Sequence, residues 1–469
     1  MTVLTAASAT EEFEEACTAW LAPGYPSDAA QQSAIVLKPA DAKDVGAAVQ
    51  FAVSKGLPLT VRGGGHSWRR LFVVDNGLTI DLSSMKGIAV NAKDRIAVVE
   101  GGVIYDEVLG KCKPYNLAPS WGSCGDVGTG TPLAGGLNLL SRAYGLGTDN
   151  IVGAKLVTAN GSLIQVDKHR NADVLAIIRG AGTTLGVVVE LTVKLHPVDP
   201  YHGVLLTASD ATTTPQTFSR IIQWTRDVMK IEPRIGIELG QEWEDGKMSL
   251  LIWAGAAGEM SKEDLATYIE PLQALSNVNQ SQLDSPTYYD IIANMNQLVD
   301  DIPYGSNYQV VFHLSYDQAD DDFLKFASDL AFQNLPEGVT GIVFWDIVGN
   351  REGPNAIRDT ASLTPFATDV DLQVFIIFMW LDPKDNQRNW DFGEGIRRRI
   401  EPRVMNSQAY VNQATFVTDQ WLTSQVGGAA NLRALRAMKA KLDPQNVFRH
   451  HSYVGLWPAE SAQVQQVQM

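Results

Sequence analysis

A glycine-rich segment in the first third of the chain constrains the fold more than any other feature. It runs from Trp121 to Gly136 and contains six glycines among sixteen residues. Because glycine adopts backbone conformations that other residues avoid, this composition disfavours a regular helix or strand and predicts a backbone wrapped around a bound group. Cys124 in this segment has two interpretations. Neighbouring amide groups favour a reactive thiolate, whereas a lone cysteine is more often buried and inert.

Two further glycine-rich segments lie on either side of it. Residues 62–68 (RGGGHSW) follow a predicted strand. Consecutive glycines can present a nest of backbone amides that suits a pyrophosphate, and a histidine beside the nest is both nucleophile and proton carrier. A flexible hairpin with an incidental histidine is the alternative. Residues 179–188 (RGAGTTLGVV) precede a strand and lack the G-x-G-x-x-G spacing, which disfavours a nicotinamide cofactor.

Hydrophobic periodicity predicts a mixture of helices and strands in the first 200 residues. Asp41 is a suitable N-cap for a helix that stops at Gly56. The clearest strand is Leu185–Leu195, in which every second residue is apolar. Shorter strands are predicted at residues 57–61, 78–82, 96–100, 155–159 and 163–166.

The pattern changes after residues 197–200, where two prolines indicate a domain boundary. The following block predicts helices at 216–230 and 261–275 and longer, aromatic-rich strands at 308–315, 341–347 and 372–381. We expect residues 201–405 to form an α+β unit with a largely antiparallel sheet. A final amphipathic helix is predicted at 431–442, with Leu432, Leu435 and Met438 facing inward.

Composition excludes several classes of function. The chain has 37 Lys and Arg against 53 Asp and Glu, and a net charge of −16 argues against binding to nucleic acid or an anionic membrane. No apolar run approaches the roughly 20 residues that span a bilayer, and the acidic N-terminal region argues against a signal peptide. Three cysteines do not suggest a disulfide framework, and His450-His451 lacks a third metal ligand at useful spacing. We therefore expect a cytoplasmic enzyme without a metal site.

Together, the motifs resemble those of the berberine-bridge-enzyme-like branch of the FAD-linked oxidases, within the vanillyl-alcohol-oxidase superfamily with its PCMH-type FAD-binding domain. The similarity extends along nearly the whole chain, in matching order and spacing. It rests on RGGGHSW (62–68), GLTIDLSSMKGI (77–88), GSCGDVGTG (122–130), RAYGLGTDNIVGAKLVTANG (142–161), RGAGTTLGVV (179–188), AYVN (409–412) and LDPQNVF (442–448).

The resemblance implies a two-domain α+β fold. Residues 1–200 would form the N-terminal part of the FAD-binding domain, and residues 406–469 would complete it. Residues 201–405 would form the substrate domain, an antiparallel sheet covered by helices that roofs the flavin.

The resemblance also implies how FAD is held. In this family the histidine of the GGGH motif carries the flavin 8α-methyl group, and the cysteine of the G-x-C motif attaches at flavin C6. His66 and Cys124 fall on these positions, which implies a bicovalent FAD. Val127 falls on a gate position above the flavin where valine is associated with oxygen access. The other implied FAD-binding residues are Arg62, Gly63, Gly64, Gly65 and Ser67 at the pyrophosphate loop, Gly128, Thr129 and Gly130 at the flavin, and Gly180, Gly182, Gly186 and Val188 along the adenosine half.

The sequence departs from the family pattern where catalysis is expected. Gln413 stands where the family often has a tyrosine that acts as general base, and Asn138 stands where another tyrosine is frequent. Pro132 replaces a histidine of the same loop. Neutral amides cannot serve as ordinary bases, so the usual tyrosinate-assisted deprotonation is in doubt.

Three residues remain as catalytic candidates. Gln373 and Asp371 are two residues apart on a predicted strand and therefore share a face, with Gln373 near a position where relatives carry a polar or acidic catalytic residue. A solvated carboxylate at a strand end is the alternative for Asp371. Tyr410 is a weaker candidate because a structural role would explain it equally well.

The function implied is an FAD-dependent oxidase that transfers hydride from a substrate C–H to flavin, with O2 reoxidation to hydrogen peroxide. Aromatic residues in the middle block favour an alkaloid, polyketide or terpenoid substrate and hence tailoring of a secondary metabolite. Two alternatives stay open: a carbohydrate oxidase of the same branch, and a cyclase or isomerase that uses the flavin scaffold without net redox change. A flavin dehydrogenase with another electron acceptor is a third, and oligomeric state is not indicated.

Overall fold

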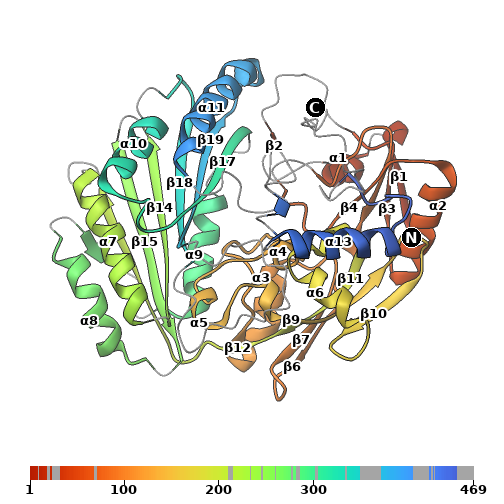
Figure 1. Ribbon diagram of the computed structural model, residues 1–469, viewed down its shortest axis with the longest axis horizontal. Helices are drawn as coiled ribbons and strands as arrows, with labels where there is room; N and C mark the ends of the chain where they lie inside the picture. Colours follow the sequence, from red (N-terminus) through yellow and green to blue (C-terminus); the bar gives the residue numbers. More distant parts are fainter. Residues whose placement is uncertain are drawn as a thin grey trace.

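The structure shown in Figure 1 is a computed structural model. It describes residues 1–450 except 9, 18–21, 24–31, 68–70, 210–214, 233, 245–246, 259, 276–277, 281–285, 301–304, 333–334, 349–370, 405–421, 424–425 and 427.

Two sheets with a helix between them form the N-terminal half. One has four strands in the order β1 (Thr2–Thr5), β3 (Ile35–Lys38), β5 (Leu78–Asp81) and β4 (Leu59–Arg62). The other has five antiparallel strands in the order β10 (Leu163–Asp167), β9 (Ile151–Val157), β11 (Val187–Lys194), β7 (Ile96–Glu100) and β6 (Ile88–Asn91).

Helix α2 (Ala42–Lys55) contacts both of these sheets and begins and ends where the sequence predicts. The Asp41 side chain accepts hydrogen bonds from the backbone amides of Lys43 and Asp44, and Gly56 ends the helix with φ of 63°. Val45, Ala48, Val49 and Ala52 form the buried face of the helix. The predicted capping is confirmed.

The second half is built on one large, largely antiparallel sheet, as predicted. Its eight strands lie in the order β16 (Val278–Gln280), β13 (Tyr201–Ser209), β15 (Lys247–Ala257), β14 (Ile235–Glu244), β18 (Thr340–Ile347), β19 (Leu372–Trp380), β17 (Ser306–Leu314) and β2 (Ala22–Pro23). Among the strand pairs of this sheet that the structure describes, only that of the short β2, which belongs to the N-terminal region, is parallel.

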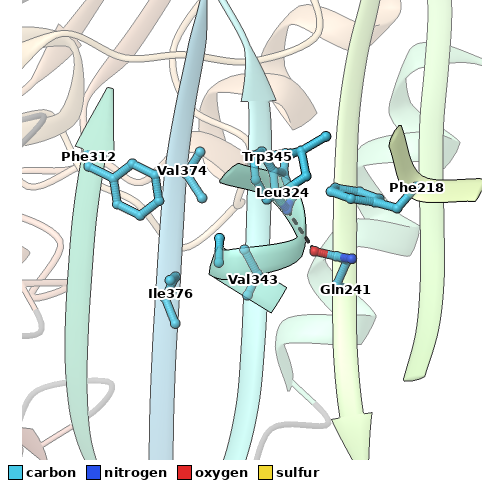
Figure 2. Close-up of a pocket in the computed structure, with 9 residues that line it drawn as sticks. Phe218, Gln241, Phe312, Leu324, Val343, Trp345, Val374 and Ile376 are labelled. Carbon is cyan, nitrogen blue, oxygen red and sulfur yellow. Dashed lines mark hydrogen bonds between the residues drawn. The ribbon is translucent and has the colours of Figure 1, made fainter. Parts of the chain in front are cut away.

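Helices cover one face of this sheet (Figure 1). They are α7 (Pro215–Ile231), α8 (Lys262–Gln273), α10 (Asp321–Phe332) and α11 (Asn386–Ile400). Figure 2 shows the side chains on the helix-facing side, where Phe312, Val343 and Val374 pack, and the Trp345 indole donates to Gln241 at 2.8 Å. A gap of about 10 Å³ remains there, close to the volume one water requires.

The opposite face of the sheet turns toward the N-terminal half. Because side chains alternate along a strand, Ile237 and Leu239 of β14 join the helix-side core while Glu238 points the other way. At Gly236 the strand abuts the backbone of Leu139 so closely that a Cβ atom would collide with its carbonyl oxygen. This second face, on which helix α9 (Tyr288–Asp300) also packs, is therefore held directly against the segment that follows the glycine-rich residues 121–136.

Helix α13 (Ala429–Leu442) packs against the N-terminal half (Figure 1). Leu432, Leu435 and Met438 are buried, as the sequence predicts. Lys439 is buried beside them, and its ammonium group donates to the Thr184 carbonyl at 2.8 Å. These contacts agree with the proposal that the C-terminal segment completes the first domain, although the exact boundaries stay a prediction.

His196 makes the protein sensitive to acid. It lies at the end of the long strand pattern, stacked on Tyr144 at 4.1 Å, with Nε2 2.8 Å from Oδ1 of Asn150. Burial, and secondarily the cations Lys194 and Arg95, lower the pKa of His196 to about 4. Since the unfolded chain then binds more protons below about pH 6.5, stability is lost as pH falls from there toward 4.

The free energy of unfolding should fall between pH 7 and pH 5 in both proteins. We expect this fall to be about 2 kcal/mol smaller in His196→Gln than in the wild type. Chemical denaturation at both pH values measures the difference, so a constant cost of the substitution cancels. His169→Gln, at an exposed position of the same half of the molecule, controls for the exchange of a histidine for a glutamine. An equal pH dependence in wild type and His196→Gln would contradict this assignment.

Candidate active site

A cavity of about 340 Å³ lies between the glycine-rich segments of the N-terminal half and the face of the large sheet on which α9 packs. Residues 63–67 and 122–131 form one side, and strands β14, β15, β17, β18 and β19 form the other. The sheet contributes apolar or aromatic side chains and polar ones in equal number: Trp253, Phe344, Phe375 and Ile377 against Glu238, Gln309, Asp346 and Gln373. The first two glycine-rich segments, for which the sequence predicts a role at a bound group, therefore line one cavity.

The two candidate attachment residues meet at the wall of this cavity. Nε2 of His66 lies 3.8 Å from Sγ of Cys124, although 58 residues separate them in the sequence. Burial lowers the pKa of His66 to about 4, so its imidazole is neutral and nucleophilic near pH 7.

Hydrogen bonds next to Cys124 fix its position. The Gly125 amide donates to Oδ1 of Asn296 at 2.7 Å, and the Asn296 amide group donates to the Asp106 carboxylate at 3.0 Å. Asn296 belongs to helix α9 (Tyr288–Asp300) and Asp106 to helix α3 (Tyr105–Cys112). The cysteine is therefore held from both halves of the molecule.

Glycines allow the two loops that carry His66 and Cys124 to cross each other in close backbone contact at Gly64 and Gly128. A Cβ atom on Gly64 would lie 2.7 Å from the Gly128 nitrogen and 2.8 Å from its Cα atom. At Gly122 a Cβ atom would lie 2.8 Å from Cγ2 of Val127, which itself lines the cavity. Such separations are shorter than van der Waals contact, so glycine is required at these crossings.

The donor set suits a phosphate-bearing group such as FAD. Among the described residues, neither Oγ of Ser67 nor Nε of Arg62 has a hydrogen-bond partner, although both atoms are buried. Ser67 lines the cavity directly after the glycine run, and Nη1 of Arg62 is already paired with Asp81 at 3.3 Å. Buried donors without partners beside a glycine nest are the arrangement that a pyrophosphate would satisfy.

The predicted cofactor residues divide into two groups. Those that line the cavity are Gly63, Gly64, Gly65, His66, Ser67, Cys124, Val127, Gly128 and Gly130. Arg62, Thr129, Gly180, Gly182, Gly186 and Val188 do not line it. Some of this second group has structural contacts instead: the Thr129 hydroxyl donates to the Gly101 carbonyl at 2.7 Å, and Gly182 packs against Leu133. Roles in binding FAD stay predictions for both groups.

The structure separates the predicted catalytic residues. Gln373 is buried and lines the cavity. Asp371 does not line it, and its carboxylate accepts a hydrogen bond from the Tyr316 amide at 2.8 Å. Asn138 is buried behind the cavity, where its amide group donates to the Tyr288 hydroxyl at 3.1 Å. These placements favour Gln373, while Tyr410 and Gln413 lie outside the described residues.

Sequence reasoning missed two carboxylic acids in the cavity, Glu238 and Asp346. They lie opposite each other on β14 and β18, and Asp346 lies opposite Gln373 on β19. Nε2 of Gln373 donates to Oδ2 of Asp346 at 3.0 Å, and Oε1 of Gln373 lies 3.3 Å from Nε2 of His313 on β17. The sequence does contain a signal for Glu238: an acidic residue within an apolar strand pattern, IGIELG (235–240), is unusual for a structural strand and indicates a functional role.

Burial changes the protonation of this row of side chains. Burial and the charge of Asp346 raise the pKa of Glu238 well above its usual range. Burial also raises the pKa of Asp346 to about 6, against the lowering effect of the Gln373 hydrogen bond. For His313, burial lowers the pKa to about 4, so it is neutral at pH 7.

Comparisons with known proteins identify the cofactor domain. A family model described as an FAD binding domain matches residues 33–167, which include both His66 and Cys124. The uncharacterized FAD-linked oxidoreductase YgaK of Bacillus subtilis is 26% identical over 86% of this chain and 86% of its own length. The chain contains an FAD binding domain and is similar along most of its length to FAD-linked oxidoreductases.

Solved structures similar to this chain confirm the predicted fold class. The 6-hydroxy-D-nicotine oxidase of Arthrobacter nicotinovorans superposes with a TM-score of 0.81 at 21% identity, covering 97% of this chain and 98% of that one. Glucooligosaccharide oxidase of Acremonium strictum, described with a 6-S-cysteinyl, 8α-N1-histidyl FAD, gives 0.80 at 21% identity and 97% coverage of each chain. No helix in the described part of the chain has the length and apolar character to cross a bilayer.

Proposed function

We propose that the protein is an FAD-dependent oxidase of a small organic molecule, with O2 as the electron acceptor and hydrogen peroxide as a product. The observation that carries the proposal is the meeting of His66 and Cys124 at a cavity enclosed by the N-terminal half and the large sheet. When bound, FAD supplies the acceptor for a hydride from the substrate and passes the electrons to O2. The chain positions the substrate and excludes water.

We propose that FAD is attached at both His66 and Cys124. A neutral imidazole and a thiol, 3.8 Å apart, are the two nucleophiles that such attachment needs. The glucooligosaccharide oxidase that shares this fold is described with the same pair of linkages. Arg62, the glycine run that follows it and Ser67 would hold the pyrophosphate.

We propose an aromatic or alicyclic substrate in preference to an oligosaccharide. Trp253, Phe344 and Phe375 line the sheet side together with Ile377. Such a wall suits a flat apolar skeleton with a few polar groups. We therefore propose an alkaloid, polyketide or terpenoid as substrate, in the tailoring of a secondary metabolite. The relative that oxidises 6-hydroxy-D-nicotine shows that this fold accommodates such a molecule.

Peptide mapping tests the attachment. We expect acid-precipitated wild type to retain flavin, with adducts on the His66 and Cys124 peptides. Cys124→Ser should retain only the histidyl adduct, and His66→Ala only the cysteinyl one, because each linkage has its own nucleophile. His169→Ala, an exposed histidine, should retain both. Flavin that dissociates fully from the wild type in acid would contradict the attachment.

Peroxide release tests the reaction. Purified protein is screened in air with benzylic alcohols, benzylic amines and oligosaccharides, and peroxide is quantified against protein without substrate. We expect release with an aromatic alcohol or amine. Bleaching of the flavin under anaerobic conditions without peroxide in air would indicate a dehydrogenase, and a converted substrate without bleaching would indicate an isomerase or cyclase. Either result would overturn the oxidase proposal.

A further inference from the structure

Two carboxyl groups face the cavity from neighbouring strands. Glu238 and Asp346 occupy directly opposite positions on the antiparallel strands β14 and β18. Both residues are more than nine-tenths buried and line the cavity. Two ionised carboxylates at opposite positions of a buried strand pair repel each other, so the arrangement favours one proton between them.

The surroundings of the pair favour one proton and one negative charge. Nε2 of Gln373, from β19, donates to Asp346 at 3.0 Å. This contact stabilises a carboxylate. Two buried tyrosines, Tyr201 of β13 and Tyr288 of α9, are the other titratable groups that interact with Glu238, and burial keeps both neutral by raising their pKa.

No described residue that lines the cavity is a lysine or an arginine, so no protein cation fixes both acids in the ionised form. The remaining titratable groups of the lining are His66 and Cys124, assigned above to the cofactor. Double ionisation would place two like charges on neighbouring buried strands without a cation to pair with them, which is strongly unfavourable. One carboxylate and one carboxylic acid is the arrangement that the site stabilises.

We propose that Glu238 and Asp346 hold one proton between them and form the acid–base group of this enzyme. The inference rests on the proposed oxidase function and names the substrate chemistry that it requires. The substrate carries an O–H or N–H on the carbon that is oxidised, as in an alcohol or an amine.

The proton balance of the reaction follows from this assignment. The ionised member of the pair accepts the proton of the substrate O–H or N–H, and a new carboxyl O–H bond forms. The electron pair of the broken O–H or N–H bond becomes the second bond of a C=O or C=N group as the neighbouring C–H bond breaks and hydride departs. The stored proton then leaves the pair and, with the two electrons and the proton of the hydride, converts O2 to hydrogen peroxide.

The pair takes the acid–base role that tyrosines often have in the family, because Gln413 and Asn138 stand at those tyrosine positions in this chain. Gln373 acts through Asp346, so it is a positioning residue: its amide group orients the carboxylate and stabilises its charge.

Infrared spectroscopy of the flavin-loaded enzyme without substrate tests the shared proton. We expect a protonated-carboxyl C=O band at pH 7 that shifts in D2O and disappears in both Glu238→Gln and Asp346→Asn. Glu263→Gln is the matched control, because Glu263 is an exposed carboxylate of α8 in the same half of the molecule. The wild-type spectrum decides by itself if a variant does not fold: absence of a protonated carboxyl at pH 7 overturns the proposal.

Steady-state kinetics with the best alcohol or amine from the peroxide screen test the acid–base role. We expect Glu238→Gln and Asp346→Asn to lower kcat by about 100-fold, the usual contribution of general acid–base catalysis. Both should displace the acidic limb of the wild-type pH profile, which the second protonation of the pair produces near pH 6, whereas Glu263→Gln should retain the wild-type values. Variants that keep kcat and the same acidic limb overturn the acid–base role, whereas a wild type without flavin or peroxide release overturns the oxidase function itself.

Discussion

Asp443→Ala lowers the free energy of unfolding by about 3–5 kcal/mol, because it leaves a buried lysine without its counter-ion. Lys439 and Asp443 are both fully buried, with Nζ of Lys439 2.6 Å from Oδ2 of Asp443. The ammonium group also donates to the carbonyls of Thr184 and Phe448, at 2.8 and 3.0 Å. Removing the carboxylate therefore strands a charge that water cannot reach.

The same carboxylate closes the turn that follows α13. It accepts hydrogen bonds from the amides of Val447 and Phe448, at 2.7 and 2.9 Å. The Phe448 side chain is buried in the core of the four-stranded sheet and α2. Asp443→Ala thus loosens the attachment of the C-terminal segment to the N-terminal half as well as the ion pair.

A second ion pair of α13 provides the control. Lys441 and Asp173 lie 3.9 Å apart, and their side chains are 67% and 60% exposed. Exposed pairs contribute about 0–1 kcal/mol, so Asp173→Ala should change stability little. Urea denaturation of both variants measures the contrast. Equal stability of Asp443→Ala and the wild type would show that the buried pair does not hold the C-terminal segment in place.

The sequence predicts this half of the structure well because local signals and tertiary packing agree there. Asp41 and Gly56 bound α2, and the alternation that ends at Leu195 survives as the buried face of β11, although hydrogen-bonded pairing begins at Val187. The role of Asp443 was not predictable. Only the fold shows that the LDPQNVF motif encloses a lysine from the preceding helix.

The candidate site is predictable in part, for a similar reason. Glycine runs and unusual neighbours mark His66 and Cys124 in the sequence, whereas their separation of 3.8 Å is a property of the fold. Glu238 and Asp346 lie on different strands, and nothing in either strand alone indicates that they are opposite each other. For Asp371 the sequence predicted too much. Its spacing of two residues from Gln373 predicts a shared face of the strand, but Asp371 lies at the strand end, where its carboxylate accepts a hydrogen bond from the Tyr316 amide.

The glycine crossing provides the prediction that links fold and cofactor most directly. We expect Gly64→Val to lower the free energy of unfolding by about 3 kcal/mol, at the upper end for overpacking, because the new side chain meets backbone and not a movable side chain. The Cβ atom alone would lie 2.7 Å from the Gly128 nitrogen. A backbone peptide group cannot rotate out of the way as a flexible side chain can. Differential scanning calorimetry measures the loss.

Separation of these two loops should also reduce cofactor content. His66 follows Gly64 by two residues, and Cys124 precedes Gly128 by four. A displaced crossing therefore moves the two proposed attachment residues apart. We expect less flavin per protein chain in Gly64→Val and a larger loss of the doubly attached form than of total flavin, as read from absorbance and peptide mapping.

Gly110→Ala is the matched control, since no atom outside its own helix lies within 4 Å of the added Cβ. Alanine at this exposed position of α3 should leave flavin content unchanged and raise helix stability by roughly 0.5–1 kcal/mol. If Gly64→Val instead retained full stability and both linkages, the two loops would not need their close approach. The meeting of His66 and Cys124 would then have to depend on the hydrogen bonds around Gly125, Asn296 and Asp106 alone, and Asn296→Ala would become the substitution that separates them.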